Sequence, residues 1–537
     1  MIRRTFLTGL VLLLQPVVAS AAELLPPNVP IEQAIDHYIN AGLSEAKIKP
    51  APLADDAALL RRLTLDLNGR IPTPGELDEY LTSKNPDKKI KLVDRLMASP
   101  AFVRHQALEF ATLLQADTPG KKGMQGGGLR DYLQTAFSEK RSWDRIFRQI
   151  MLPDQNNPKE KGAGEFLKSR VKDLNRVTID VSSLFFGVNI SCAQCHDHPH
   201  VLDWKQDHFY GMKSFFARTY EKGGFVGERD QGVVKFIPNK GKEKVAKVMF
   251  LSGKVIEAPG SVEVPKEKTK RKDPPGKGPP AAPKFSLRAK LVELALEPEQ
   301  REFFSRAIAN RIWYRLYGRG LVMPLDQMHS ANPASHPELL QWLARDVVEH
   351  GYDLRRLVRG LLLSNAYARS SRWEGEDVPQ DKYFAVGQIR ALTPMQMAVS
   401  LRLASSNPEK IPRSGPELEK YIENQERSAG RLAGMFVQPS DNFQVSVDEA
   451  MLFANNESLL KEVLTDSPGS LVGRLKQIAE PEKRAELAIR SVLNRPAQPD
   501  EVRTLADYLR RRQDRPAAGN QQMVWALLTS PEFRFSH

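Results

Sequence analysis

The segment of residues 265–284 sets the strongest limit on the fold, because it cannot belong to a packed core. It contains seven Lys or Arg residues against two acidic ones, and most of the other positions are Pro or Gly. Such a composition is typical of an extended or disordered linker. The linker separates two long stretches of a 537-residue chain that is itself too long for a single core.

Apolar residues recur at helical spacing on both sides of this linker. Within residues 176–186 they occupy one helix face, and Gly187 follows where a C-terminal cap belongs. Residues 73–76, Thr-Pro-Gly-Glu, combine an N-cap, a proline at the first helical position and a glutamate three residues after the cap. We therefore predict one helical domain over residues 22–220 and a second over residues 285–537.

Residues 221–264 have a different pattern. Short β-branched runs are separated by turn sequences such as Asn-Lys-Gly and Ser-Gly, which is typical of antiparallel strands. The predicted fold class is mainly α: a multi-domain helical protein with a small antiparallel β unit and a Pro/Lys-rich linker in the middle.

One sequence pattern occurs more than once. Each copy predicts a capped helix and, farther along the chain, a Ser-led turn that buries an aromatic side chain. The copies are residues 70–77 with 96–102, residues 495–502 with 527–533, and more loosely residues 336–339 with 362–367. Their number is too small and their spacing too irregular for a solenoid.

The first 21 residues have the features of an export signal. Arg3 and Arg4 precede an apolar run over residues 10–18, and Ala-Ser-Ala at residues 19–21 is a typical cleavage site. The order Arg-Arg-Thr-Phe-Leu also fits the twin-arginine pattern, so both this route and the general secretory (Sec) route stay open. We expect export to the periplasm or cell envelope, with no transmembrane helix after signal cleavage.

The net charge of +13 does not by itself indicate a nucleic-acid-binding protein. Much of the positive excess lies in the linker of residues 265–284, and the sequence has no basic stripe interleaved with aromatic residues. Weak attraction to anionic surfaces is the remaining expectation. An envelope protein or a redox protein is the expected partner.

Both cysteines of the chain lie in the motif Cys192-Ala-Gln-Cys195-His196. The C-x-x-C-H order is that of covalent c-type haem attachment. Because the chain has only two cysteines and ten histidines, chance would rarely produce this order. We interpret the motif as the functional centre of the protein.

The chain resembles a known combination of domains. Residues 60–67 (Leu-Arg-Arg-Leu-Thr-Leu-Asp-Leu) and 192–198 (Cys-Ala-Gln-Cys-His-Asp-His) are similar to domain-of-unknown-function family 1549. Residues 309–313 (Ala-Asn-Arg-Ile-Trp) and 318–322 (Gly-Arg-Gly-Leu-Val) are similar to family 1553. The chain is thus identified as a member of the exported bacterial proteins that join these families, also called Planctomycete cytochrome-like and associated domains. The resemblance implies an organisation of the chain but no established activity.

A c-type haem in an electron-transfer or redox protein is the first hypothesis for the motif. Cys192 and Cys195 would form the thioethers, and His196 would be the proximal iron ligand. The sixth ligand is open among Met212, His208 and His198. Two features count against haem: the polar Asp-His-Pro-His sequence, and a possible twin-arginine route, which carries folded proteins.

A zinc or iron site, structural or hydrolytic, is the second hypothesis. Thiolate and imidazole suit these metals, and the candidate ligands are Cys192, Cys195, His196, His198 and His208. His329 and His336 are candidate remote ligands, although packing is the simpler explanation for His336 at a helix start. The third hypothesis is a disulfide between the two cysteines in a cell-envelope scaffold or interaction protein.

The sequence supports no particular reaction. It contains no nucleophile elbow, Walker loop, dinucleotide fingerprint or zinc-protease motif. Carboxylates are plentiful, but no pair has the pattern of a glycosidase. Whether the protein is an enzyme therefore stays open.

Overall fold

The computed structural model describes residues 24–115, 128–199, 201–260, 278–439 and 456–537. The predicted export signal and most of the predicted linker lie outside these ranges. Within them the fold is mainly α, as predicted, and strands occur only in short antiparallel pairs. None of the described helices is long and apolar enough to cross a membrane.

The helices before the linker include the one predicted to start at residues 73–76 and the one predicted over residues 176–186. They are α1 (Ile31–Glu45), α2 (Asp56–Asn68), α3 (Pro74–Thr82), α4 (Lys88–Ala98), α5 (Pro100–Gln115), α6 (Gly128–Ser138), α7 (Trp143–Met151), α8 (Glu165–Lys168), α9 (Leu174–Phe186) and α10 (Gln206–Ser214), with the 3-10 helices η1 (Lys161–Gly164) and η2 (Ser191–Gln194). The predicted capping box starts α3: the Thr73 hydroxyl accepts the Glu76 N–H at 3.2 Å, and the Glu76 carboxylate accepts the Thr73 N–H at 2.8 Å.

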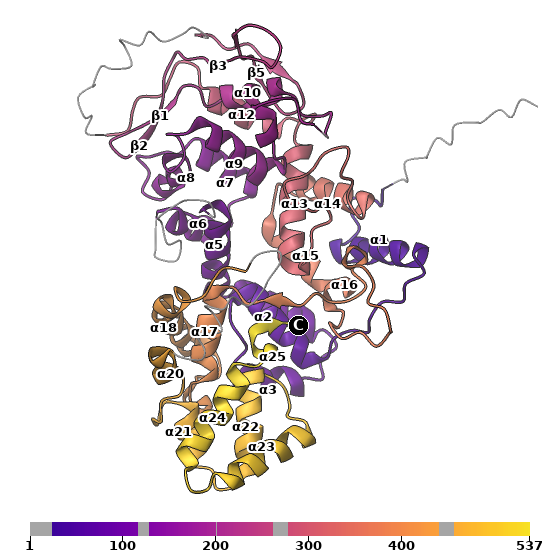
Figure 1. The fold of residues 1–537 in the computed structure, drawn as a ribbon, viewed down its shortest axis with the longest axis vertical. Coiled ribbons are helices and arrows are strands. Elements are labelled where there is room, and N and C mark those ends of the chain that lie inside the picture. The colour runs from indigo at the N-terminus through magenta and orange to yellow at the C-terminus, as the bar shows by residue number, and fades with distance from the viewer. Residues whose placement is uncertain (1–23, 116–127, 200, 261–277, 440–455) are drawn as a thin grey trace, which may run out of the picture.

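Helices also dominate after the linker. They are α12 (Leu287–Leu296), α13 (Glu302–Tyr317), α14 (Pro337–Glu349), α15 (Leu354–Leu363), α16 (Asn365–Ala368), α17 (Pro394–Ala404), α18 (Gly415–Ala433), α20 (Glu457–Val463), α21 (Leu471–Lys476), α22 (Pro481–Leu493), α23 (Pro499–Arg511), α24 (Pro516–Leu528) and α25 (Pro531–Arg534), with the 3-10 helices η3 (Asp381–Tyr383) and η4 (Pro408–Lys410). Figure 1 shows α21–α24 at one end of the molecule and α10 at the other.

The predicted β unit consists of three separate hairpins. They are β1 (Thr219–Lys222) with β2 (Phe225–Glu228), β3 (Lys235–Phe236) with β4 (Lys244–Val245), and β5 (Val248–Met249) with β6 (Val255–Ile256). A fourth pair, β7 (Arg390–Ala391) with β8 (Phe535–Ser536), was not predicted. It joins two segments that are far apart in the sequence.

The buried side chains form two clusters. The larger cluster takes residues from both sides of the linker, from Ile31 to Ala385, and α13 packs against both α9 and α14. The smaller cluster draws on residues 392–533, together with Leu65 and Ile71. The predicted domain boundaries around the linker stay a prediction. The larger core, however, contains residues from both sides of the linker.

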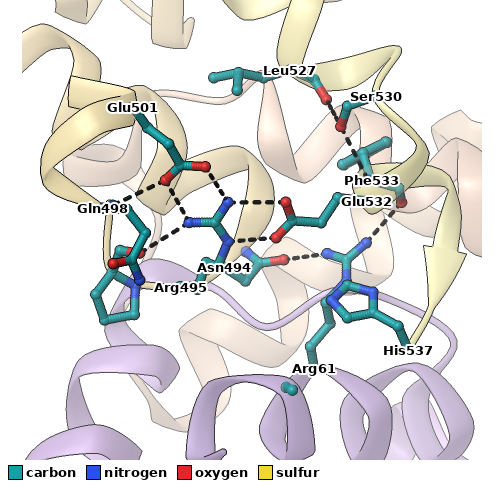
Figure 2. A network of polar contacts seen from close by, with 12 residues as sticks. Arg61, Asn494, Arg495, Gln498, Glu501, Leu527, Ser530, Glu532, Phe533 and His537 are labelled. Atoms are coloured by element: carbon teal, nitrogen blue, oxygen red, sulfur yellow. Dashed lines mark hydrogen bonds and ion pairs between the residues drawn. The ribbon is translucent and has the colours of Figure 1, made fainter. Parts of the chain in front are cut away.

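Helix α2 contributes side chains to both clusters. In Figure 1 it lies between α15 on one side and α22 on the other. Every residue from Leu59 to Asn68 is buried, including two arginines and an aspartate. Arg61 donates to the Asn494 side-chain oxygen at 2.6 Å and to the Phe533 carbonyl at 2.7 Å (Figure 2). Arg62 donates to the Tyr367 carbonyl at 2.5 Å. The helix therefore bonds to segments that lie more than 300 residues away.

The sequence repeat corresponds to a repeated set of contacts. Arg70 donates to both carboxylate oxygens of Glu76, at 2.7 and 2.8 Å. Arg495 donates in the same way to Glu501, at 2.8 and 2.6 Å (Figure 2). In each copy the glutamate also accepts the N–H of the residue that caps its helix.

The Ser-led turn is present in all three copies. The N–H groups of Phe102, Tyr367 and Phe533 donate to the hydroxyls of Ser99, Ser364 and Ser530 at 3.2, 3.1 and 3.3 Å. All three aromatic rings are buried. The predicted turn is therefore confirmed in all three copies, and the predicted capped helix in the first two.

Candidate functional site

The C-x-x-C-H motif follows α9 and is held against a segment from the other side of the linker. Gly187 ends α9 with φ of 68°, and a Cβ there would lie 2.7 Å from the Met328 sulfur. The Gly187 carbonyl accepts the Met328 N–H at 3.0 Å. Asn189 donates its N–H to the Asp326 carbonyl at 2.7 Å and its amide to the Asp326 carboxylate at 2.9 Å. Residues 187–189, which lead into the motif, are therefore held against residues 326–328.

The two thiols lie on the short turn η2 and on the residue after it. Ile190 and Ala193 are fully buried and anchor this turn to the larger core. Cys192 and Cys195 are exposed and are free thiols. The side chains that would react with a haem or a metal therefore face solvent, while their neighbours hold the backbone in place.

His196 is exposed, and one of its ring nitrogens is already engaged. Its Nδ1 lies 2.7 Å from the Asp197 carbonyl oxygen. A carbonyl can only accept, so Nδ1 carries the ring proton. In the neutral imidazole, Nε2 then presents a lone pair.

His198 and His208 have the opposite arrangement. The Val201 N–H donates to Nδ1 of His198 at 3.1 Å, and the Lys205 N–H donates to Nδ1 of His208 at 3.1 Å. In both neutral rings the proton is therefore on Nε2, which leaves no lone pair for a metal. Burial, followed by the positive charge of Lys205, lowers the pKa of His208, so its ring is neutral near pH 7.

Met212 differs from the two cysteines in its exposure. It is fully buried in the larger core, and the neighbouring Gly211 has no room for a Cβ against Met249. The sequence suggested Met212 as a sixth haem ligand. The structure shows this side chain packed in the core, and its role as a ligand stays a prediction.

Two residues that hold the motif were not singled out from the sequence. The Gln206 amide donates to the Cys195 carbonyl at 3.0 Å, and the Tyr210 hydroxyl donates to the Gln194 carbonyl at 3.0 Å. Asp197 accepts the Gln206 N–H at 2.9 Å at the start of α10. The Tyr210 ring stacks on Phe236 at 4.0 Å. Their only signal in the sequence is that they follow the motif closely.

A cavity of about 540 Å³ lies beside the motif. His208, Trp204, His329 and Asp203 line it, but neither cysteine does. Asp203 accepts both the N–H and the hydroxyl of Ser330, each at 2.8 Å. The structure thus brings the suggested remote ligand His329 near His208 but does not place it against the thiols.

The other suggested remote ligand, His336, has a packing role. Its ring lies 5.7 Å from the Phe384 ring and fills the space beside Gly42. Burial lowers its pKa to about 4, so the ring is neutral near pH 7. His336 is the residue immediately before the first turn of α14. Within the described part of the chain, no group of three or more His, Cys, Asp or Glu side chains is arranged to hold a metal ion.

Comparison with known proteins gives two matches. Residues 34–221 match PSCyt2, described as a protein of unknown function (DUF1549). Residues 287–509 match PSD1, described as a protein of unknown function (DUF1553). No curated protein and no solved structure matches the chain.

Proposed function

The chain belongs to the proteins that combine the DUF1549 and DUF1553 domains, and on this premise we propose that it is an exported redox protein that carries a c-type haem. The observation that carries the proposal is the contact between Nδ1 of His196 and the Asp197 carbonyl oxygen, at 2.7 Å. The His196 Nδ1–H donates to this carbonyl, so Nε2 is ready to bind iron. Metal-binding imidazoles commonly use their second nitrogen in this way.

Cys192, Cys195 and His196 would hold the haem. Thioether formation needs accessible thiols, and both are exposed. The bonds from Gln206 and Tyr210 to the motif carbonyls keep the spacing of these three side chains fixed. When bound, the group would supply one-electron transfer at its iron.

We further propose that, of the residues that the structure describes, His196 alone would bind the iron. Met212 is buried in the core, and His198 and His208 carry their protons on the nitrogen that a metal would need. The iron would then stay open to a small external ligand.

A zinc or iron site at the same residues is the second hypothesis. It would need at least one ligand beyond Cys192, Cys195 and His196, because a structural zinc ion binds four ligands. The described residues assemble no such group, so this reading requires the neighbouring loop to rearrange. A disulfide scaffold would require oxidation of the two thiols, which are free in the structure.

The sequence supports export as the setting for this chemistry. We propose a periplasmic or cell-envelope location, reached by the Sec or the twin-arginine route, and a redox or envelope protein as the partner. Two-electron oxidation of the bare thiols would compete with haem attachment there. The protein should therefore be examined with its haem attached to the two cysteines.

The test is the visible spectrum of the full chain, purified from a host with haem-attachment machinery. We expect a Soret band that persists after acid–acetone extraction, and a shift of this band on adding carbon monoxide to the reduced protein. The variant C192A/C195A should lose the band. His196→Ala should change the spectrum, whereas His198→Ala should leave it unchanged.

The other readings predict different results. One equivalent of zinc or iron without a Soret band would support the metal site and exclude the haem proposal. The absence of both, with no free thiol, would leave the disulfide scaffold. Circular dichroism of the variants serves as the folding control, because the exposed cysteines contribute little to the core.

A further inference from the structure

The hairpin β3–β4 lies beside the C-x-x-C-H motif, and side chains of α10 fix it there. The Gln206 amide joins the two segments: its oxygen accepts the Asn239 N–H at 3.1 Å, and its nitrogen donates to the Cys195 carbonyl at 3.0 Å. The Tyr210 ring stacks on Phe236 at 4.0 Å, and the Tyr210 hydroxyl donates to the motif backbone. Figure 1 shows β3 and β5 next to α10 at one end of the molecule. A protein that docks over the two exposed thiols therefore also meets this hairpin.

The hairpin carries a high density of positive charge. Residues 235–247 contain five lysines and one glutamate, and all six side chains are exposed. Two of the lysines are paired, Lys235 with Glu243 at 3.6 Å and Lys244 with Asp207 at 2.7 Å. The other three form no ion pair with any carboxylate that the structure describes, and they are Lys240, Lys242 and Lys247.

The acidic residues of the motif region bind other groups. Asp197 accepts the Gln206 N–H at 2.9 Å at the start of α10. Asp203 accepts the N–H and the hydroxyl of Ser330, each at 2.8 Å. The surface beside the thiols therefore presents three ammonium groups that have no carboxylate of their own.

Exposed apolar side chains accompany this positive charge. Ile237 is 68% exposed and Val245 is 48% exposed. Lys235 lies opposite Val245 in the hairpin, and side chains alternate along a strand, so Ile237 shares a face with Val245 and points away from Phe236. Leu202, which follows the motif, is 90% exposed. Apolar groups beside exposed charges are typical of surfaces at which proteins meet.

We propose that the β3–β4 hairpin, with the motif beside it, is the docking surface for an acidic protein partner. The inference rests on the proposed function, which requires a partner to deliver or remove an electron at the motif. Positive charge beside the motif attracts an acidic surface and raises the rate of association. An anionic lipid bilayer would cover the exposed thiols without exchanging an electron, so the observations favour a protein.

The two thiols themselves report the local charge, because they are the only cysteines of the chain. The test uses the full chain from a host without haem-attachment machinery. It compares the initial rates at which the thiols react with dithiobis(nitrobenzoate), a dianion, and with neutral dithiodipyridine. At about 0.01 M salt, Lys240→Glu/Lys242→Glu should lower the ratio of the anionic to the neutral rate at least about threefold. The ratio cancels any change in the reactivity of the thiols, and the decrease should disappear at about 1 M salt.

Arg511→Glu/Arg512→Glu is the matched control. It changes the net charge by the same amount at two exposed residues, at the end of α23, which Figure 1 shows far from β3. Its rate ratio should equal that of the wild type. An unchanged ratio in Lys240→Glu/Lys242→Glu, or an equal decrease in both variants, would contradict the proposal. Circular dichroism of both variants is the folding control.

A binding measurement identifies the class of partner. Polyglutamate serves as the probe for an acidic protein surface, and phosphatidylglycerol vesicles serve as the probe for an anionic membrane. Polyglutamate should bind the wild type at about 0.01 M salt, and Lys240→Glu/Lys242→Glu should weaken this binding at least about tenfold. Arg511→Glu/Arg512→Glu should weaken it by less than about twofold. Equal weakening by both variants, or hairpin-dependent binding to the vesicles but not to polyglutamate, would overturn the proposal.

Both measurements are independent of the haem spectrum. If the chain takes up no haem but both effects of Lys240→Glu/Lys242→Glu are present, the docking surface stands and the haem proposal fails. If the chain takes up haem and neither effect is present, the haem proposal stands and the docking surface is wrong.

Discussion

Buried arginines at single positions of α2 bind main-chain oxygens far from them in the sequence. Arg61 and Arg62 are 1% and 3% exposed, and their guanidinium groups donate to carbonyls of Phe533 and Tyr367. Burial lowers the pKa of Arg61 to about 10, so it remains charged at neutral pH. The sequence shows these residues only as polar interruptions of an apolar helix, because their partners have no local signal.

The Arg495–Glu501 pair predicts a specific dependence on pH. Hydrogen bonds from Arg495 lower the pKa of Glu501 below its ordinary value of 4.5. A carboxylate of this kind stabilises the fold above its ordinary pKa, and the contribution is lost as the pH falls through the lower, folded-state value. Glu501→Gln should therefore be less stable than the wild type at neutral pH, and the difference should shrink in acid.

Urea unfolding midpoints at neutral pH and at strongly acidic pH measure this difference. Glu457→Gln is the control, because Glu457 is 82% exposed in its pair with Lys461 and such pairs contribute little. A Glu501→Gln deficit that stays the same in acid would contradict the assignment.

At the scale of elements, local chemistry determines most of the helix boundaries. The Thr73 capping box and the Gly187 cap were predicted from a few adjacent residues, and both are present. The β7–β8 pair was missed because each strand has two residues and they lie about 145 positions apart. The C-x-x-C-H motif could be recognised in the sequence. The ring orientation of His196 could not be predicted, because it depends on the fold of the backbone around it.

The three Ser-led turns predict graded losses of stability. Replacing a Ser cap by Ala typically costs about 0.5–2 kcal/mol. Ser364→Ala should be the most damaging, because Ser364 is fully buried and its hydroxyl also bonds to the Tyr317 hydroxyl at 2.7 Å. Ser99→Ala and Ser530→Ala should fall lower in the range.

Thermal and urea unfolding of the three variants give this ranking. Ser252→Ala, at an exposed turn of the β unit, is the control and should match the wild type. Equal effects at all four positions would show that the turns are not packing units.

At the scale of the whole molecule, α2 connects the two hydrophobic cores. The sequence instead suggested two helical domains separated by the linker. Asp66 links Tyr367, from the larger core, to Arg390, which precedes the smaller one. Periodicity alone did not predict this coupling, because it depends on which helices meet in space. The helical class was predictable, and the pairing of distant segments was not.

Asp66→Asn should weaken both cores together. Asp66 is 5% exposed in its ion pair with Arg390, and breaking a buried pair typically costs about 3–5 kcal/mol. Hydrogen exchange should increase both in α15 of the larger core and in α22 of the smaller one. Asp94→Asn, in an exposed pair with Arg359, should change neither. Loss of protection on one side only would show that the cores unfold separately.

The contact between Arg61 and Phe533 also has a consequence for synthesis. The two residues are 472 positions apart, and ribosomes add roughly 5–20 residues per second. Arg61 therefore leaves the ribosome roughly 25–95 seconds before its partner has been made. The larger core is fully synthesised once Ala385 is made, but the smaller core is incomplete until Phe533 is made. The nascent chain is therefore open to chaperones or to a secretion receptor during this time. The side chains that join the two cores are among the first to be synthesised, but they are among the last to find their hydrogen-bond partners.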